Sequence, residues 1–168
     1  SGVGTESHSC AITTDSDVYC WGGGNTSAYN IGLPGPATKI SVGGASSCAI
    51  IDNGSVYCWG SNWFGQLGIG WRGNDGPANW TGCDDYCTPL LPENSVAVDI
   101  SVGEVHACAV MNNGSAYCWG WNEGRIGTSA VAAEMPTPTL VEVPEGKEIS
   151  TISAGGYHTC AILTDGKA

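Results

Sequence analysis

The chain has 168 residues, of which 26 are Gly, 9 are Cys and 7 are Trp, and its formal net charge is −11. A hydrophobic content of 42% supports a folded core and excludes an intrinsically disordered acidic tail. We expect no nucleic-acid partner, because 5 Lys and Arg residues cannot neutralise a phosphate backbone, and no membrane insertion within this segment, because it has no run of about 18 apolar residues.

Along the chain, one short unit occurs three times in full and a fourth time in part. Each full unit has Cys-Ala and an aliphatic residue, followed by Tyr-Cys-Trp-Gly, and a short strand such as Ile100-Ser101-Val102 precedes each of the last three units. The repeat cores lie near residues 8–32, 40–68, 100–127 and 152–168. The polar segments 70–93 and 128–147, which contain Pro and Gly, are predicted to be insertions.

Each core is predicted to be a β-hairpin. Residues 55–59 alternate between polar and apolar with a period of two, as a strand with one buried face does. The turns are supplied by Asp52-Asn53-Gly54 and Asn112-Asn113-Gly114, and Asp15-Ser16-Asp17 is a weaker version of the same turn. The expected fold class is therefore all-β.

The cysteines of each hairpin stand ten residues apart, and their midpoint is the hairpin tip. A tight turn there places the two residues opposite each other, close enough for a disulfide. In the first insertion, Cys83 and Cys87 are expected to close a small loop with each other. The predicted disulfides are Cys10–Cys20, Cys48–Cys58, Cys83–Cys87 and Cys108–Cys118.

Cys160 is left without a partner, because the same spacing puts its partner two places beyond Ala168. We therefore expect the chain to be part of a longer protein; an intermolecular disulfide and a free thiol are the alternatives. Zinc is the alternative for the pairs, although only Cys83 and Cys87 have the spacing that metal sites favour, and we expect no metal and no cofactor. So many disulfides predict an oxidising compartment, hence an extracellular or cell-surface location.

Four Asn-x-Ser/Thr sequons agree with that location, since such asparagines accept N-linked glycans in secreted proteins. The candidate glycosylation residues are Asn25, Asn53, Asn79 and Asn113. For Asn53 and Asn113 the alternative is a turn residue without sugar, because Asn-Gly is itself a turn signal.

His8, His106 and His158 each stand two residues before a Cys, and Ser46 takes that position in the second unit. A position that recurs from repeat to repeat favours a hydrogen-bonding role in the fold over catalysis, and we expect no catalytic residues.

Five of the seven tryptophans fall into two groups. Trp21, Trp59 and Trp119 occupy equivalent positions and are predicted to pack between repeats. By contrast, Trp71 and Trp80 fall in the first insertion and are the candidate contacts for a partner. The alternative for these two is a small core of the insertion itself.

Residues 53–68 and 155–166 carry a resemblance to the repeat of the regulator-of-chromosome-condensation family. In that family such repeats build a seven-bladed β-propeller of four-stranded blades. The resemblance therefore implies that residues 1–168 form part of a propeller, with about three and a half repeats. The paired cysteines depart from nuclear members and are similar to the extracellular repeats of Crinkly-type plant receptor kinases and of secreted microbial or algal proteins.

The expected function is that of a non-enzymatic extracellular propeller module, a protein-interaction or structural scaffold in a larger secreted or cell-surface glycoprotein. A component of a coat or filament is one form of this function. The alternatives are a ligand-binding receptor ectodomain and an inhibitor or regulator of a secreted enzyme. The expected partner is a protein or further copies of this chain.

Overall fold

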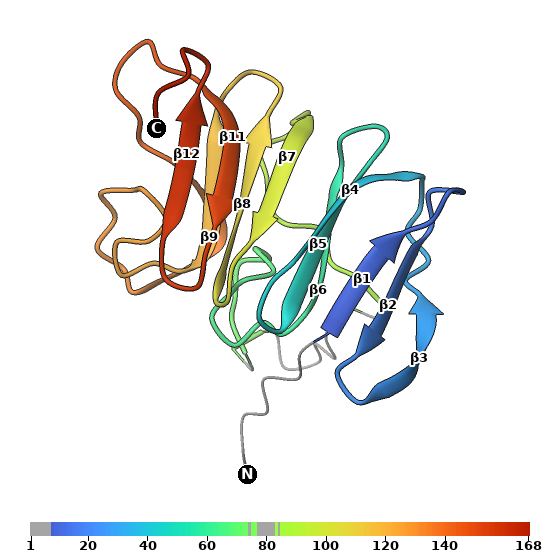
Figure 1. Ribbon diagram of the computed structural model, residues 1–168. Coiled ribbons are helices and arrows are strands. Elements are labelled where there is room, and N and C mark those ends of the chain that lie inside the picture. Colours follow the sequence, from blue (N-terminus) through green and yellow to red (C-terminus); the bar gives the residue numbers. More distant parts are fainter. Residues whose placement is uncertain (1–7, 74, 77–82, 84) are drawn as a thin grey trace.

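The computed structural model describes residues 8–73, 75–76, 83 and 85–168. This described part is all-β, with strands in four antiparallel sheets (Figure 1). Sheet 1 holds β1 (His8–Ile12), β2 (Val18–Gly22) and β3 (Asn25–Asn30); sheet 2 holds β4 (Ala37–Val42), β5 (Ser46–Ile51) and β6 (Val56–Gly60); sheet 3 holds β7 (Ala97–Val102), β8 (His106–Met111), β9 (Ala116–Trp121) and β10 (Glu134–Leu140); sheet 4 holds β11 (Ile149–Ala154) and β12 (Thr159–Leu163). In the described part, no helix is long and apolar enough to cross a membrane.

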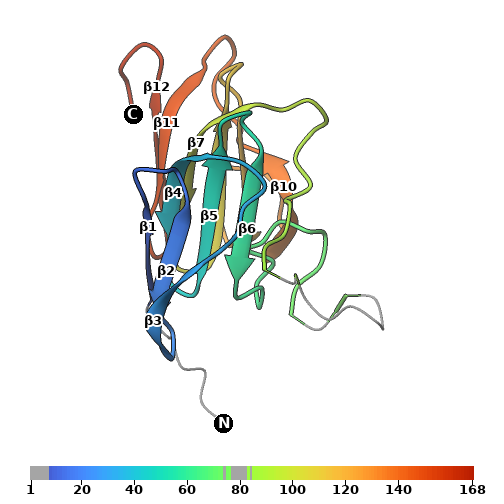
Figure 2. The same ribbon diagram turned by 90° about the vertical axis from the view of Figure 1, so that its right-hand side faces the viewer.

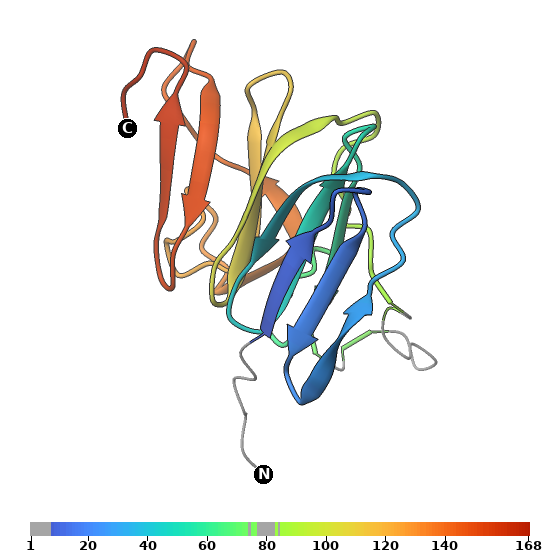
Figure 3. The same cartoon turned by 45° about the vertical axis from the view of Figure 1, so that its right-hand side comes forward.

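The sheets stand side by side in chain order and fan out like the blades of a propeller. Figure 1 shows sheet 1 on the right and sheet 4 on the left, and Figure 3 brings sheet 1 to the front. The first strands of sheets 2, 3 and 4 are neighbours, since β7 contacts both β4 and β11. At the opposite edge of sheet 3, β10 lies farthest from these strands (Figure 2). The arrangement is a partial β-propeller.

A hydrophobic core fills each seam between neighbouring sheets. Strand alternation sends one face of a sheet to each neighbour: in sheet 2, Ala49 and Trp59 pack toward sheet 1, whereas Ile50 and Cys58 pack toward sheet 3. Consequently β5 and β8 are buried along their whole length. Burying a side chain of the size of Ile50 contributes about 1.5–3 kcal/mol, so each sheet depends on its neighbours for stability.

The hairpin registers place paired cysteines directly opposite each other. In sheet 2, Cys48 is the register partner of Cys58, with their Cα atoms 4.1 Å apart. In sheet 3, Cys108 and Cys118 are 4.0 Å apart at the same atoms. The equivalent cysteines of sheet 1 follow the same pattern, with Cα atoms 4.1 Å apart, and all three pairs are disulfide-bonded.

Residues 128–147, expected to be an insertion, contain the strand β10, which completes sheet 3. The strand signal is hidden because Pro136 and Pro138 interrupt it and lack backbone donors. The pairing of β10 with β9 shifts register between Met135 and Thr139, and an edge strand tolerates that irregularity. The prolines therefore mark an edge strand here and not a loop.

The other expected insertion, residues 70–93, also reaches the edge of a sheet. Cys58 and Cys87 exchange backbone hydrogen bonds of 2.8 and 2.6 Å. Cys87 thus holds in sheet 2 the place that Thr139 holds beside Cys118 in sheet 3. A disulfide joins Cys87 to Cys83, with their Cα atoms 5.3 Å apart, so the insertion is held to the sheet by a covalent loop.

Candidate interaction site

Hydrogen bonds between side chains join neighbouring sheets at equivalent positions. The Nε2 atom of His8 lies 2.6 Å from the hydroxyl of Ser47, and that of His106 lies 2.8 Å from the hydroxyl of Thr159. In the second repeat Ser46 replaces the histidine, and its hydroxyl is buried without a hydrogen-bond partner among the described residues. The recurring histidine joins two sheets, the role in the fold that its repetition predicts.

The first strands of sheets 2, 3 and 4 are joined in a similar way. The Ser41 hydroxyl on β4 accepts a hydrogen bond from the Val102 amide on β7, at 2.9 Å. One repeat later, the Ser101 hydroxyl accepts from the Ala154 amide on β11, also at 2.9 Å. Because both bonds use the same repeat position, each sheet is set against the next with the same offset.

Asp99 on β7 connects three sheets at once. One carboxylate oxygen accepts from the Lys39 ammonium on β4 at 3.0 Å, and the other accepts from the Thr151 hydroxyl on β11 at 2.6 Å. Burial by itself raises the pKa of Asp99, but the hydrogen bonds from Thr151 and Lys39 outweigh it and hold that pKa below its usual value. The ionised form of Asp99 is therefore the one that bridges the sheets.

His106 lies fully buried at the start of β8, in the seam between sheets 3 and 4. Burial, and then the electrostatic interactions with Arg125 and His158, lower its pKa to about 4. The imidazole is therefore neutral at neutral pH. Its Nδ1 atom has no hydrogen-bond partner among the described residues, so no nearby acceptor favours the protonated form.

Two buried asparagines hold the loops that follow β6 and β9. The Asn122 side-chain amide donates to the carbonyls of Ala130 and Ala132, at 2.8 and 3.0 Å. The Asn62 amide donates to the Trp71 carbonyl at 2.9 Å. These asparagines were not among the predicted site residues, although the signal is present: each stands two residues after Trp-Gly in its repeat.

Beyond these asparagines lies a row of stacked side chains that crosses three sheets. The Phe64 and Trp121 rings have their centroids 4.4 Å apart. The Arg125 guanidinium carbon lies 5.1 Å from the centroid of the Trp121 ring and 5.1 Å from that of the Tyr157 ring. Each ring face stabilises the cation through its negative potential. We call these four residues, together with Trp63, the stacked rim.

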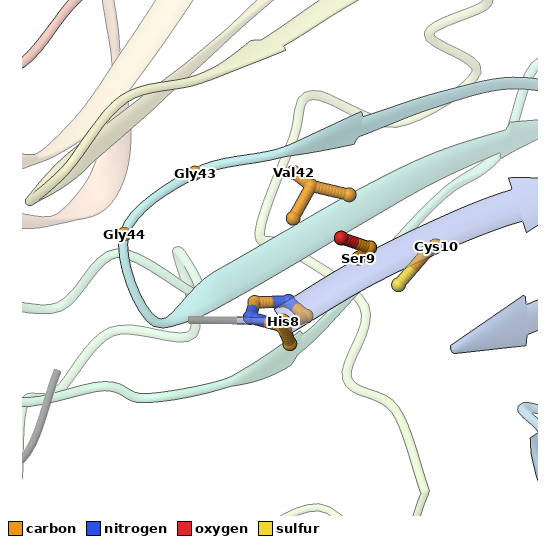
Figure 4. Close-up of a pocket in the computed structure, with 6 residues that line it drawn as sticks. All are labelled: His8, Ser9, Cys10, Val42, Gly43 and Gly44. Carbon is orange, nitrogen blue, oxygen red and sulfur yellow. The ribbon is translucent and has the colours of Figure 1, made fainter. Parts of the chain in front are cut away.

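One hollow on the described surface, of about 430 Å³, lies between β1 and the end of β4. Figure 4 shows His8 beside the loop that carries Gly43 and Gly44. The lining residues are His8, Ser9, Cys10, Val42, Gly43 and Gly44. A second hollow, of about 390 Å³, lies between the sheet 3 hairpin tip at Asn113 and the segment around Val143. Among the described residues, no group of three or more His, Cys, Asp or Glu is placed to hold a metal ion.

Comparison with known proteins supports the repeat pattern. The family model described as "Regulator of chromosome condensation (RCC1) repeat" matches residues 53–110 and 113–162. A second model with the same description matches residues 3–27, 37–66 and 97–124. The chain belongs to the RCC1-repeat family. Members of this family use their propellers for protein interaction.

Curated relatives are similar along most of this chain. The Ultraviolet-B receptor UVR8 of Arabidopsis thaliana is 28% identical over 165 residues, which cover 92% of this chain and 37% of UVR8. The human probable E3 ubiquitin-protein ligase HERC6 is 31% identical over 175 residues, which cover 93% of this chain and 16% of HERC6. The chain therefore spans less than half the length of these RCC1-repeat relatives.

Solved structures share the arrangement of the sheets. Yeast RCC1 (Prp20), solved with Kap60 bound, aligns with a TM-score of 0.76 at 22% identity, over 95% of this chain and 40% of that one. The ectodomain of the Physcomitrella patens receptor kinase CR4 aligns with a TM-score of 0.50 at 24% identity, over 96% of this chain and 37% of that one. At such identities the likeness shows the fold, which is that of RCC1-type propellers.

The tryptophans of the RCC1 repeats differ in burial. Trp59 and Trp119 are 6% and 0% exposed in their seams, and the Trp119 indole donates to the Gln66 carbonyl at 2.8 Å. Trp21, at the equivalent position of sheet 1, is 41% exposed. The candidate partner contact Trp71 is half-buried and packs against the core between sheets 2 and 3, while Trp80 lies outside the described residues.

Of the sequon asparagines, Asn25, Asn53 and Asn113 are exposed, and Asn79 lies outside the described residues. In two of them the Oδ1 atom accepts a hydrogen bond from the backbone amide two residues later, at 2.9 Å for Asn53 and 3.0 Å for Asn113. This turn role does not compete with glycosylation, because a glycan is attached to the other side-chain atom, Nδ2. Cys160 is exposed and is the free cysteine of the described part.

Proposed function

We propose that this chain is part of a non-enzymatic, extracellular RCC1-type propeller that acts as a protein-interaction scaffold in a larger secreted or cell-surface glycoprotein. The observation that carries the proposal is the disulfide repeated across the hairpins of sheets 1, 2 and 3. Reducing compartments remove such bonds, whereas secreted proteins retain them. The exposed sequons at Asn25, Asn53 and Asn113 fit the same location.

The location is tested in the cells that make the protein. Intact cells are treated with a membrane-impermeant amine-reactive biotin, and the captured protein is analysed by mass spectrometry after alkylation without reduction. We expect surface biotinylation, intact bonds at the three hairpin pairs, and a glycan mass on one or more sequons that endoglycosidase removes. A protein found only inside the cell with alkylated hairpin cysteines would refute the extracellular assignment.

The interaction role is tested separately. The cell-surface or secreted protein is cross-linked in place, purified and examined for partners held at fixed stoichiometry. We expect a discrete protein partner. Recovery of a secreted hydrolase whose activity falls on binding would favour the regulator alternative, and recovery of a released peptide or small ligand would favour the receptor alternative.

A further inference from the structure

The stacked rim leaves two large aromatic side chains open to solvent while their neighbours are fixed. Trp63 and Tyr157 are each 61% exposed, although Phe64, Trp121 and Arg125 between them are half-buried. Exposed Trp and Tyr that rest on an ordered base are the residues that most often contribute large binding energies at protein interfaces. Their cost of ordering on binding is low, because both rings have few rotatable bonds.

The base under these rings is held by contacts within the protein. Stacking fixes Phe64 against Trp121, and Arg125 lies between Trp121 and Tyr157. The Asn62 side chain fixes the start of the loop that carries Trp63 and Phe64. Gly73 lies beside the Trp63 ring, since a Cβ added at Gly73 would be in van der Waals contact with it. The rim is therefore preorganised before any partner binds.

The charges around the rim indicate the sign of the charge that a partner would carry. Arg125 is paired with Glu123 at 3.1 Å, so its charge is already compensated. At the Trp63 end, Arg72 pairs with both Asp75 and Glu134.

Glu104 adds an acid that has no cation among the described residues, and its carboxylate lies against Gly156, next to Tyr157. The cations at the rim are thus compensated internally, acids remain in excess, and the whole chain carries a net charge of −11.

We propose that the stacked rim is a docking surface for a protein segment that carries an Arg or Lys beside apolar side chains. The open ring faces of Trp63 and Tyr157, at the two ends of the rim, accept cationic side chains, and the remaining ring surface takes the apolar neighbours. At the Tyr157 end, Glu104 compensates the charge of the bound cation. This inference rests on the proposed role in protein interaction and specifies where on the molecule the partner binds.

The test uses the purified chain and three labelled 12-residue peptides of Gly, Ser and Leu. The first carries three Arg, the second carries citrulline in place of Arg, and the third carries Glu. Binding is measured by fluorescence polarisation at low ionic strength. We expect the Arg peptide to bind, and the citrulline and Glu peptides to bind at least tenfold more weakly.

Trp63→Ala and Tyr157→Ala are each expected to weaken Arg-peptide binding at least tenfold, with Tyr29→Ala on β3 as the matched control that leaves it unchanged. Circular dichroism and urea midpoints confirm that each variant is folded.

Equal binding by the rim variants, equal binding of the citrulline peptide, or no binding of the Arg peptide would overturn the proposal. Binding of a chito-oligosaccharide in place of the Arg peptide, abolished by the same variants, would overturn it in favour of a sugar site. If cross-linking recovers a partner whose capture is unchanged in Trp63→Ala, the docking surface is wrong while the interaction role stands.

Discussion

Lowering the pH is expected to weaken the seam between sheets 3 and 4 through His106. Its pKa in the folded protein is about 4, against an ordinary value of 6.5. Between these values the unfolded chain binds a proton that the folded chain does not. The stabilisation is therefore complete above pH 6.5 and is lost as the pH falls toward 4. From pH 7 to pH 5 the lost stability is about 2 kcal/mol, because one pKa unit corresponds to about 1.4 kcal/mol.

Urea unfolding followed by tryptophan fluorescence at pH 7, 6 and 5 measures this loss. His106→Gln keeps a donor for Thr159 but does not titrate, so its free energy of unfolding should depend less on pH than that of the wild type by about 2 kcal/mol over this range. His158→Gln, at the equivalent exposed position of sheet 4, should reduce the pH dependence only slightly, because His158 makes the smallest of the contributions that lower the pKa of His106. Parallel curves for wild type and His106→Gln would refute the assignment of the pH dependence to the buried imidazole.

Three further changes test the hairpins and loops, each by urea unfolding. Replacing Cys108 and Cys118 together by Ala should lower the free energy of unfolding by about 3 kcal/mol, the stabilisation expected of a disulfide that closes a loop of this length. Adding reductant to this variant should cause no further loss from the same hairpin. An unchanged urea midpoint would contradict a bonded pair. Ser16 has a φ of 66° at the turn position where the other hairpins have Gly, so Ser16→Gly should stabilise sheet 1 by about 1 kcal/mol, and a lower midpoint would argue against strain there. Asn122→Ala removes a buried side chain and its two hydrogen bonds to the Ala130 and Ala132 carbonyls, and should cost about 2 kcal/mol. The exposed Asn113→Ala should cost less; equal losses would mean that Asn122 does not hold its loop.

The hairpins were predictable because each depends on contacts within about ten residues. Turn chemistry at Asn53-Gly54 and alternation on both sides fix the strands, and the cysteine spacing then follows from the register. The strand β10 was not predictable in this way. Its prolines remove the local signal, and its place is set by pairing with β9 across a long connection.

The rim and the seam contacts lay beyond local reasoning for a related reason. The sequence shows that His106 recurs, but not that its partner is Thr159, one sheet further along. Likewise nothing near Arg125 in the sequence indicates that its second ring partner is Tyr157, on the next sheet. Such contacts depend on the angle between sheets, which is a property of the packed seam.

The stacked rim and the seam beneath it are physically coupled. Arg125 stacks on Tyr157 of the next sheet and also lowers the pKa of the buried His106, whose hydrogen bond to Thr159 closes the same seam. A ligand that binds only when Tyr157 is held in the stack also favours the closed seam, by mass action. The basic peptide should therefore raise the urea midpoint of the wild type more at pH 7 than below pH 4, where His106 is protonated in the folded protein and opposes closure. An equal increase at both pH values would mean that the rim and the seam act independently.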